Sequence, residues 1–497
     1  MSASERWTPA ALRERLRLYW VIDGSDLDTE AGRARVRDAL CSGVSCVQLR
    51  DKHSDTRTLV ERTRALLDMA RPWRVPVIVN DRADVALAAG ADGVHLGQSD
   101  LPLAQARAWL GPQAIIGLSL ERPEQLQQPD ALAADYLAVS PLFDTPTKTD
   151  TAPAWGLAGL RQARAATRAP LVAIGGISAD NLGEVWATGV DGVAVVRAIS
   201  AAADTGAAAA QLRARMAEVR PWRVPRVLAI AGSDSGGGAG IQADLKTVAA
   251  LGGHGMSAIT ALTAQNSVGV QAIHAAPPEF LAQQIEAVLS DIGADAIKIG
   301  MLHDEATAAV VAEALQRHPG LPVVLDPVMV ATSGHTLITP PTVQRLRERL
   351  FGLCTVLTPN LDELGLLVGE RITTLDAALQ TAQTLIAQGA RAVLVKGGHL
   401  SGDTLTDTLV DASGVRWQRN APRLHSRNLH GTGCSLSSAI ATHLARGADL
   451  VAAVDAAHHW VRKALLAGID LRLGAGHGPL NHFHHPMPLL NLENTHA

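Results

Sequence analysis

The sequence predicts a mixed α/β protein of two domains, an N-terminal TIM (β/α)8 barrel followed by a second α/β domain. The first observation behind this prediction is length, because 497 residues at about 100–200 residues per domain amount to two to four domains. The second is that short β-branched runs alternate along the chain with Ala- and Leu-rich stretches of helical period. This alternation is typical of parallel strands joined by helices.

The composition narrows the class of protein. Hydrophobic residues make up 47% of the chain and aromatic residues only 3%, while 44 residues are glycine. The interior must therefore consist mostly of Ala, Val, Leu and Ile. The 44 Lys and Arg residues nearly balance the 48 Asp and Glu residues, for a formal net charge of −4. That balance excludes the basic footprint of a nucleic-acid-binding protein and a polybasic membrane patch.

Neither a membrane span nor a targeting segment is expected. The sequence has no apolar run of the roughly 18 residues that cross a bilayer. The N-terminal stretch MSASERWTPAALRERLR lacks the apolar centre of a signal peptide. We therefore expect a cytoplasmic protein whose partners are small molecules. The four cysteines, Cys41, Cys46, Cys354 and Cys434, are not a disulfide framework in so long a chain.

Eight strands are expected in the first 200 residues, each followed by a loop and a candidate helix. They span residues 18–23, 45–49, 76–80, 93–96, 114–119, 135–140, 171–174 and 192–196. Eight such units in this length describe a compact barrel, whose active site lies on the loops that follow the carboxyl ends of the strands.

The boundary between the domains is expected just after the barrel. We assign residues 1–204 to the barrel and residues 205–224 to a linker, because the stretch SAAADTGAAAA after residue 199 is rich in alanine. A strand at 226–230 then opens a second series of strands and helices that runs to about residue 485. The second domain is assigned residues 225–497.

Polar side chains crowd the predicted strand ends of the barrel. Gln48, Arg50 and Lys52 point the same way along an extended segment and suit an anion of high charge density such as pyrophosphate. Asp81 and Asp100 follow neighbouring strands and are suited to share a Mg²⁺ ion. Each aspartate alone fits a helix N-cap equally well.

The remaining strand ends carry hydroxyls, a cation and glycines. Ser119 follows the fifth strand, and the loop after the sixth strand holds Thr145, Thr147 and Lys148. The segments at Gly176 and at Val196–Arg197 follow the last two strands, where barrels bind phosphate with backbone N–H groups. His95 also lies at a strand end, and we interpret it as structural.

Four segments of the first half, in this order and spacing, resemble thiamine-phosphate synthase: QLRDK, VNDRADVALAAGADGVHLGQSDL, SPLFDTPTKTD and AIGGI. The likeness covers about residues 16–200. It implies that the diphosphate of hydroxymethylpyrimidine diphosphate is held by Gln48, Arg50, Lys52, Asn80, Ser119 and Lys148, of which Ser119 and Lys148 are the predicted catalytic residues. It implies that Asp81 and Asp100 bind Mg²⁺. It implies that thiazole phosphate is held by Thr145, Thr147 and the backbone at Gly176, Val196 and Arg197.

This chain departs from that family at two positions, where Arg197 replaces a common Ser and Leu120 replaces a common Thr. A backbone contact tolerates the first change. The chemistry fits the residue types, because pyrophosphate leaves from a benzylic-like carbon that the thiazole nitrogen then attacks. The protein must mainly neutralise the departing charge and hold the nucleophile in line.

The second half carries two glycine-rich segments. The first, from Ala231 to Gly240, follows a strand and fits either a ligand or a tight turn; no GKS or GKT follows, so it is not a P-loop. The second is His430-Gly431-Thr432-Gly433-Cys434, which opens an apolar helix. Free N–H groups at such a helix start form an anion hole. There Cys434 would have a lowered thiol pKa and would take a proton from an attacking hydroxyl; a buried helical cysteine is the alternative.

Several segments of the second half resemble hydroxymethylpyrimidine and hydroxymethylpyrimidine-phosphate kinase, of the ribokinase-like superfamily. They include AGSDSGGGAGIQADLKT, ALTAQN, KIGML, VVLDPVMVATSG, TPNLDE, LVKGGH and HGTGCSLSSAIA, within residues 226–485. The resemblance implies that Gln265 reads the pyrimidine in a pocket lined by Gly232 and Met301. It implies Mg²⁺ at Asp326 and Glu363. It implies ATP phosphates at Lys396, Gly431 and Gly433, and Cys434 as the catalytic base. Ser235-Gly236-Gly237 departs from the usual Pro-Ser-Gly.

The two resemblances together predict a bifunctional transferase of thiamine biosynthesis that uses ATP and, in both domains, Mg²⁺. One alternative joins an active kinase to a non-condensing barrel with a regulatory or thiazole-aromatising role, which the intact QLRDK and TPTKTD segments disfavour. Another makes the kinase a pyridoxal-type enzyme, which Gln265 and the HGTGCS segment disfavour. A homodimer is possible, because related kinases often dimerise.

Overall fold

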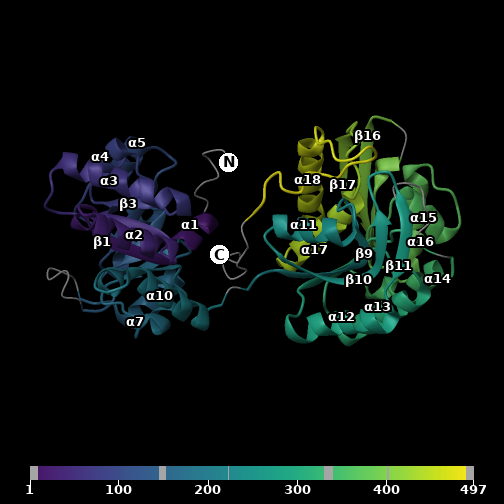
Figure 1. Ribbon diagram of the computed structural model, residues 1–497, viewed down its shortest axis with the longest axis horizontal. Coiled ribbons are helices and arrows are strands. Elements are labelled where there is room, and N and C mark those ends of the chain that lie inside the picture. The colour runs from purple at the N-terminus through teal and green to yellow at the C-terminus, as the bar shows by residue number, and fades with distance from the viewer. Residues whose placement is uncertain are drawn as a thin grey trace. The chain divides into compact units, whose positions relative to one another are not determined.

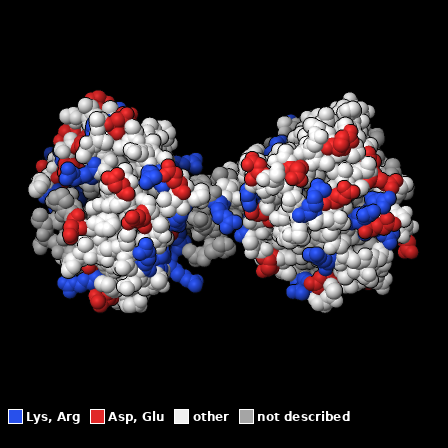
Figure 2. All heavy atoms as spheres, turned by 90° about the horizontal axis from the view of Figure 1, so that it is seen from below, with Lys and Arg blue, Asp and Glu red and all other residues white. Residues whose placement is uncertain are grey.

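A computed structural model of the protein describes residues 9–144, 153–221, 223–329, 338, 340–399 and 402–487. The chain divides into two compact units, one reaching to residue 222 and the other beginning at Arg223 (Figure 1). Acidic and basic side chains are interspersed on the face of each unit that Figure 2 shows. Among the described residues, no helix combines the length and the apolarity needed to cross a membrane.

The first unit is a closed barrel of eight parallel strands, in which each strand pairs with the next along the chain. Its last strand returns to the first, with Leu18 beside Val193, and closes the ring. The strands are β1 (Leu18–Asp23), β2 (Cys46–Arg50), β3 (Val77–Asn80), β4 (Gly93–Leu96), β5 (Ile115–Leu120), β6 (Tyr136–Val139), β7 (Leu171–Ile174) and β8 (Gly192–Val195). Each predicted strand agrees with these bounds to within one residue at either end.

Helices surround the barrel and cover the outward side chains of the strands. They are α1 (Pro9–Leu16), α2 (Glu30–Cys41), α3 (Thr56–Ala70), α4 (Ala83–Ala89), α5 (Leu103–Leu110), α6 (Pro129–Ala133), α7 (Gly156–Ala166), α8 (Leu182–Trp186), α9 (Arg197–Ser200) and α10 (Thr205–Val219). Local capping fixes where several of them begin. Thr29 accepts a hydrogen bond from Gly32 N at the start of α2, and Asp55 accepts one from Thr58 N at the start of α3.

Helix α10 corrects the predicted linker at 205–224. Asp204 caps the helix by accepting a hydrogen bond from Ala207 N at 2.8 Å. Ala209, Leu212 and Met216 are buried in the same hydrophobic core as the barrel strands, and α10 packs against α2 and α8. The alanine-rich composition misled the prediction, because alanine is the strongest helix former and a small residue that lets a helix approach its neighbours closely.

The second unit is built on one nine-stranded sheet with the order β11-β10-β9-β12-β13-β14-β15-β16-β17. Its strands are β9 (Arg226–Asp234), β10 (His254–Gln265), β11 (Val270–Ala275), β12 (Ala296–Ile299), β13 (Val323–Leu325), β14 (Val356–Leu357), β15 (Ala392–Val395), β16 (Thr404–Asp411) and β17 (Gly414–Pro422). The central strands are parallel, whereas the edge pairs β10–β11, β15–β16 and β16–β17 are antiparallel.

Two helical layers cover the faces of this sheet (Figure 1). One layer packs on the core that contains Ile230 and Ile299, and consists of α12 (Pro278–Asp291), α13 (Glu305–Arg317), α14 (Pro340–Arg349), α15 (Leu361–Val368) and α16 (Leu375–Ala387). The other packs on the core that contains Val227 and Val324, and consists of α11 (Gly240–Ala250), α17 (Thr432–Ala445) and α18 (Leu450–Gly468). Parallel strands buried on both faces explain the continuous apolar runs in the sequence.

Strand β9 is longer than the predicted 226–230. It continues through Gly232 to Asp234, with Ser233 paired to Leu262 and Asp234 to Thr263 of β10. Glycine, serine and aspartate are poor strand formers, so local propensity placed the end too early. Pairing with the long neighbour β10 overrides that propensity and carries the chain to the edge of the cavity described below.

We expect residues 1–221 and 223–497 to fold as separate polypeptides, and a fragment ending at residue 204 to be much less stable than 1–221. Burying one Leu or Met side chain contributes about 1.5–3 kcal/mol. Loss of Leu212 and Met216 should therefore lower the free energy of unfolding by about 3–6 kcal/mol. Urea unfolding followed by circular dichroism measures this difference.

Two variants of the 1–221 fragment control this comparison. Leu212→Ala should lose about 2–5 kcal/mol of unfolding free energy, whereas Gln211→Ala, at a neighbouring exposed position, should change it little. Equal stability of the 1–204 and 1–221 fragments would show that α10 is no part of the barrel.

Candidate active sites

The barrel gathers cationic and amide side chains at the carboxyl ends of β2 and β3. Gln48 is buried, Arg50 is half-buried at the end of β2, and Lys52 is exposed in the loop that follows. Asn80 ends β3. The Nζ of Lys52 lies 4.0 Å from Oδ2 of Asp81. The side chains predicted to bind the diphosphate thus lie beside the predicted metal ligands, at the end of the barrel where parallel strands place their active-site loops.

Asp81 and Asp100 face one another as a close pair of carboxyl groups. Asp81 has a φ of +62°, a strained value for aspartate, and its N–H donates to the carbonyl of His95 at 2.8 Å. Burial raises the pKa of Asp81 to about 6, with further contributions from its hydrogen bond with Asp100 and from that carboxylate's charge, while Lys52 and Arg50 oppose the shift. Two carboxylates that disfavour each other's charge fit a divalent cation between them.

The helix-capping alternative for these two residues does not hold. Helix α4 has Arg82 as its N-cap and α5 has Pro102, so neither Asp81 nor Asp100 caps the helix that follows it. Asp100 instead accepts a hydrogen bond from Gly97 N at 2.7 Å within its own loop. Both carboxylates are therefore available for a ligand.

Ser119 lies on β5 and contacts a histidine that the sequence analysis left as structural. Its Oγ lies 2.9 Å from Nε2 of His95, whose Nδ1 lies 2.9 Å from the hydroxyl of Tyr136. Burial lowers the pKa of His95 to about 4, against the opposing charge of Asp100. The imidazole is therefore neutral at physiological pH and directly touches a predicted substrate-binding residue.

The predicted phosphate loops lie after β7 and β8. Gly176 is exposed with a φ of +66°, and its carbonyl accepts a hydrogen bond from Asn181 Nδ2 at 2.9 Å. Val196 precedes the short helix α9, whose first residue, Arg197, has an exposed side chain. Thr145, Thr147 and Lys148 lie outside the described residues.

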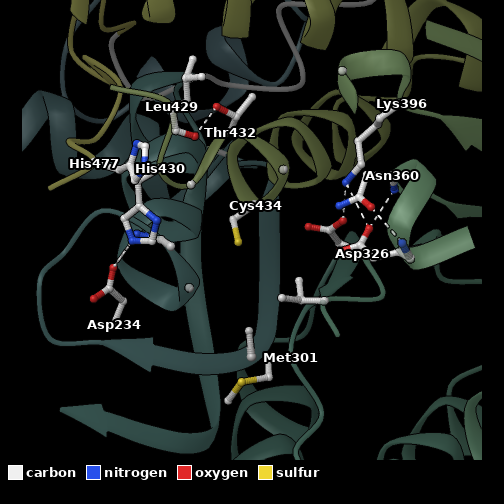
Figure 3. A pocket seen from close by; sticks show the side chains of 18 of the residues that line it. Asp234, Met301, Asp326, Asn360, Lys396, Leu429, His430, Thr432, Cys434 and His477 are labelled. Atoms are coloured by element: carbon white, nitrogen blue, oxygen red, sulfur yellow. Dashed lines mark hydrogen bonds and ion pairs between the residues drawn. The ribbon is translucent and has the colours of Figure 1, made fainter. Parts of the chain in front are cut away.

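The second unit contains a cavity of about 660 Å³ at the carboxyl ends of its parallel strands. All of the residues predicted for the kinase site line it: Gly232, Gln265, Met301, Asp326, Glu363, Lys396, Gly431, Gly433 and Cys434. Figure 3 shows Cys434 between His430 on one side and the Asp326–Lys396 pair on the other, with Met301 below it in this view. The cavity thus has an end with amide and thioether groups and an end with charged groups.

The amide end is organised by a buried aspartate. The carboxylate of Asp234 accepts hydrogen bonds from the N–H groups of Gly236, Gly238 and Ala239, and lies 3.0 Å from Nε2 of His430. Although burial works in the opposite direction, His430 and these N–H groups lower the pKa of Asp234. The same Nε2 of His430 lies 3.2 Å from Nε2 of Gln265. One carboxylate therefore fixes the glycine-rich loop and the imidazole of His430, which lies beside the residue predicted to read the pyrimidine.

The charged end joins a lysine to two carboxylates. The Nζ of Lys396 lies 2.9 Å from Oδ1 of Asp326 and 3.8 Å from Oε2 of Glu363. Glu363 also accepts a hydrogen bond from Asn360 N in the capping box of α15. Burial raises the pKa of Glu363 to about 7, with Lys396 lowering it and Asp326 raising it. This carboxylate pair, like the one in the barrel, fits a divalent cation.

Cys434 lies in the first turn of α17, but the prediction of a lowered thiol pKa is wrong for this structure. Burial raises the pKa of Cys434 to about 11; Lys298 and the Gly240 N–H lower it, while Asp244 and Asp326 raise it. The helix start has the expected geometry, because its N-cap Gly431 has a φ of +81°. Desolvation and two nearby carboxylates outweigh the effects of Lys298 and the Gly240 N–H here.

Sequence reasoning missed a buried ion pair beside this thiol. The Nζ of Lys298 lies 2.8 Å from Oδ2 of Asp244, and both side chains are fully buried. Ser438 of α17 donates to the other oxygen of Asp244 at 2.8 Å. Although burial alone would lower it, Asp244, Cys434 and Asp326 raise the pKa of Lys298. The lysine within the apolar strand run AIKI could have indicated this ion pair, because such a charge is almost never buried unpaired.

Known protein families match the two units separately. A family described as thiamine monophosphate synthase matches residues 18–199, and a family described as phosphomethylpyrimidine kinase matches residues 234–481. The hydroxymethylpyrimidine/phosphomethylpyrimidine kinase of Rhizobium meliloti is 49% identical over 258 residues, which are 52% of this chain and 96% of that protein.

Two relatives match along most of the chain. The thiamine biosynthesis bifunctional protein ThiED of Geobacter sulfurreducens is 41% identical over 449 residues, which cover 90% of this chain and 91% of that protein. The thiamine biosynthesis multifunctional protein ThiED of Corynebacterium efficiens is 42% identical over 480 residues, which cover 94% of this chain. This chain spans 64% of that longer relative.

The closed barrel of eight parallel strands confirms the predicted TIM barrel, and the nine-stranded sheet between helical layers confirms a second α/β domain. Fold and sites together define a two-domain transferase that handles phosphorylated small molecules. The chain belongs to the family of bifunctional thiamine biosynthesis proteins, in which a thiamine monophosphate synthase unit is joined to a phosphomethylpyrimidine kinase unit.

The raised pKa of Cys434 predicts how the thiol reacts. In the ligand-free protein its alkylation by iodoacetamide should rise with pH up to about 11, because only the thiolate reacts. The exposed Cys41 is the comparison within the same molecule. Mass spectrometry of the two cysteine peptides follows both rates, and a Cys434 rate that levels off near pH 7 would contradict the raised pKa.

Proposed function

We propose that the chain catalyses two consecutive steps of thiamine biosynthesis. The second unit transfers phosphoryl groups from ATP to hydroxymethylpyrimidine and then to its phosphate, which gives the diphosphate. The barrel condenses that diphosphate with thiazole phosphate and releases thiamine phosphate and pyrophosphate. The observation that carries the proposal is that one cavity brings Gln265, Cys434 and Lys396 together while the barrel mouth brings Arg50, Lys52 and two carboxylates together.

In the kinase unit, we assign the two ends of the cavity to the two substrates. Gln265, Met301 and Gly232 bind the pyrimidine ring, with Gln265 beside His430. Lys396 and the N–H groups at the start of α17 bind the transferring phosphoryl group. Cys434 lies between the ends (Figure 3) and accepts the proton of the attacking hydroxyl.

The residues present fit Mg²⁺ in both units, with Asp326 and Glu363 as ligands in one and Asp81 and Asp100 in the other. When bound, the ion supplies positive charge that screens phosphate oxygens and offsets the ligand carboxylates. Because Asp326 is among the groups that raise the pKa of Cys434, neutralising its charge favours the thiolate. Lys298 favours the thiolate in the same way.

In the barrel, Gln48, Arg50, Lys52, Asn80 and Ser119 hold the diphosphate, and the backbone at Gly176, Val196 and Arg197 holds thiazole phosphate. Thr145, Thr147 and Lys148 complete the two sites. The cationic side chains stabilise the negative charge that develops on the leaving pyrophosphate. The neutral His95 and the occupied carboxylates leave little acid–base chemistry at this end of the barrel.

The direct test supplies purified protein with hydroxymethylpyrimidine, thiazole phosphate, ATP and Mg²⁺ and measures thiamine phosphate. Supplying hydroxymethylpyrimidine diphosphate without ATP isolates the condensation, and omitting thiazole phosphate isolates the kinase. Diphosphate formation without any condensation would support the kinase assignment and exclude an active synthase. Faster phosphorylation of pyridoxal than of the pyrimidine would exclude the assigned kinase substrate.

Asp81→Ala and Asp100→Ala should each abolish condensation and leave kinase activity unchanged. Each removes one carboxylate of the pair that holds the metal ion next to the leaving diphosphate. Asp68→Ala is the matched control, because Asp68 forms only an exposed ion pair with Arg71, worth at most about 1 kcal/mol. Full condensation activity in either variant would remove that residue from the metal site.

Cys434→Ala should lower kcat of the kinase by about 10²–10⁴-fold, as expected for a missing general base, with little change in KM for the pyrimidine. Cys434→Asp should retain part of the activity, because a carboxylate also accepts a proton. Cys41→Ala, at the exposed cysteine, is the control. A Cys434→Ala enzyme with half or more of the original kcat would mean that the anion hole and metal suffice.

A further inference from the structure

A row of buried polar side chains crosses the inside of the barrel between two residues assigned to the diphosphate. Nε2 of Gln48 lies 2.7 Å from the hydroxyl of Tyr19, which lies 2.9 Å from the hydroxyl of Tyr136. That hydroxyl lies 2.9 Å from Nδ1 of His95, and Nε2 of His95 lies 2.9 Å from Oγ of Ser119. The five members come from five different strands of the barrel.

The two tyrosines in the middle of the row lie at buried positions that nonpolar side chains could also fill. The chain contains two tyrosines, and both belong to the row with exposed fractions of 2% or less. Their rings meet edge to face, and Tyr136 stacks on His95. Gly117 leaves room for this ring, because a Cβ at that position would lie 2.4 Å from the Tyr136 hydroxyl oxygen. Phenylalanine would fill this volume without burying a hydroxyl, so the hydroxyls call for another explanation.

Hydrogen-bond chemistry favours one direction along the row. The Nε2 group of Gln48 can only donate, so Tyr19 accepts from it and keeps its own proton to donate to Tyr136. Tyr136 then donates to Nδ1 of His95, which leaves the ring proton on Nε2. Ser119 accepts from Nε2, and its own hydroxyl proton remains for a ligand at the barrel mouth. In this direction each of Tyr19, Tyr136 and His95 has one donor and one acceptor partner, as buried polar groups require.

We propose that Tyr19, Tyr136 and His95 are positioning residues that present Ser119 to the substrate diphosphate as an obligate hydrogen-bond donor. The inference rests on the proposed condensation reaction, and it adds that the two ends of the row respond together. An anion that accepts from Ser119 selects the direction of every bond in the row, and hence the side of the Gln48 amide that faces Tyr19. Neutral groups achieve this orientation without placing a second charge inside the barrel.

Tyr136→Phe interrupts the row and keeps the ring. We expect kcat/KM of condensation to fall by about 10-fold, the scale of one hydrogen bond to a charged group, with most of the loss in kcat because charge on the diphosphate grows as it leaves. Ser119→Ala should lose at least as much. The double variant should then lose no more than twofold beyond Ser119→Ala, because no donor is left to orient. If the double variant instead shows the product of the two single losses, Tyr136 acts only by packing, and the proposal is overturned.

Further variants separate orientation from packing. Thr63→Val is the matched control, because Thr63 has a fully buried hydroxyl that donates to Leu59 O within α3; it should leave condensation unchanged. His95→Gln, whose amide nitrogen reaches toward the place of Nε2, should retain more activity than His95→Asn. Equal activity of the Gln and Asn variants would contradict donation from Nε2. Urea unfolding of each full-length variant, followed by circular dichroism, checks that the barrel is folded.

The row has a spectroscopic test that does not depend on turnover. Because the chain has two tyrosines, tyrosine labelled with ¹³C at Cζ gives two NMR signals from the full-length protein. Ser119→Ala should shift the Tyr136 signal, and pyrophosphate with Mg²⁺ should shift both signals of the unsubstituted protein. Unchanged signals in Ser119→Ala would overturn the row. A shift in Ser119→Ala without a response to pyrophosphate would support the row and count against the proposed diphosphate site.

Discussion

Parallel strand direction is the constraint on which both units depend. When all strands of a barrel, or the central strands of an open sheet, run the same way, their carboxyl ends meet at one edge, and polar side chains there are brought together from distant parts of the sequence. Asp81 and Asp100 approach one another because β3 and β4 are neighbours. Asp326, Lys396 and Cys434 meet for the same reason, after β13, after β15 and on α17. The cost is a concentration of charge that each site must balance.

The two units balance this charge differently. The kinase cavity uses ion pairs, Lys396 with Asp326 at its charged end and Lys298 with Asp244 near Cys434. Removing one member of such a buried pair typically costs about 3–5 kcal/mol, whereas replacing both with well-packed hydrophobic residues is often harmless. A buried pair is therefore weak evidence for a stabilising role and better evidence for a functional one. Lys298 lowers the pKa of the Cys434 thiol, which is a task that a hydrophobic pair would not perform.

The elements of the fold followed from the sequence wherever local and long-range preferences agree. The barrel strands combine β-branched runs with turn residues, and their bounds are predicted to within one residue. The errors arise where tertiary contacts decide. Alanines in α10 suggest a linker until its contacts with α2 and α8 are known, and the Gly-Ser-Asp end of β9 suggests a loop until its pairing with β10 is known. Both are cases in which packing overrides composition.

The site residues also divide into those that the sequence identifies and those whose role depends on tertiary contacts. Motif spacing identifies the groups that line the cavity, because each follows a recognisable strand or begins a helix. It does not identify the partners Asp244 and Tyr136, because their role lies in contacts made across the sheet or the barrel. It also gave the wrong direction for the pKa of Cys434, since a helix start is visible in sequence whereas the depth of burial is not.

The thiol and the serine illustrate one physical difference between the two sites. In its proposed role as a base, Cys434 must change its protonation state, so the charges of Lys298, Asp244 and Asp326 around it matter. In its proposed role, Ser119 must only keep its proton pointing toward an anion, so the neutral row behind it is sufficient and a charge there would be a disadvantage. A lysine in place of His95 would attract the diphosphate but would donate to Ser119 and Tyr136 at once, and Tyr136 would then have no acceptor in that direction. The imidazole, with one donor and one acceptor nitrogen, transmits direction without charge.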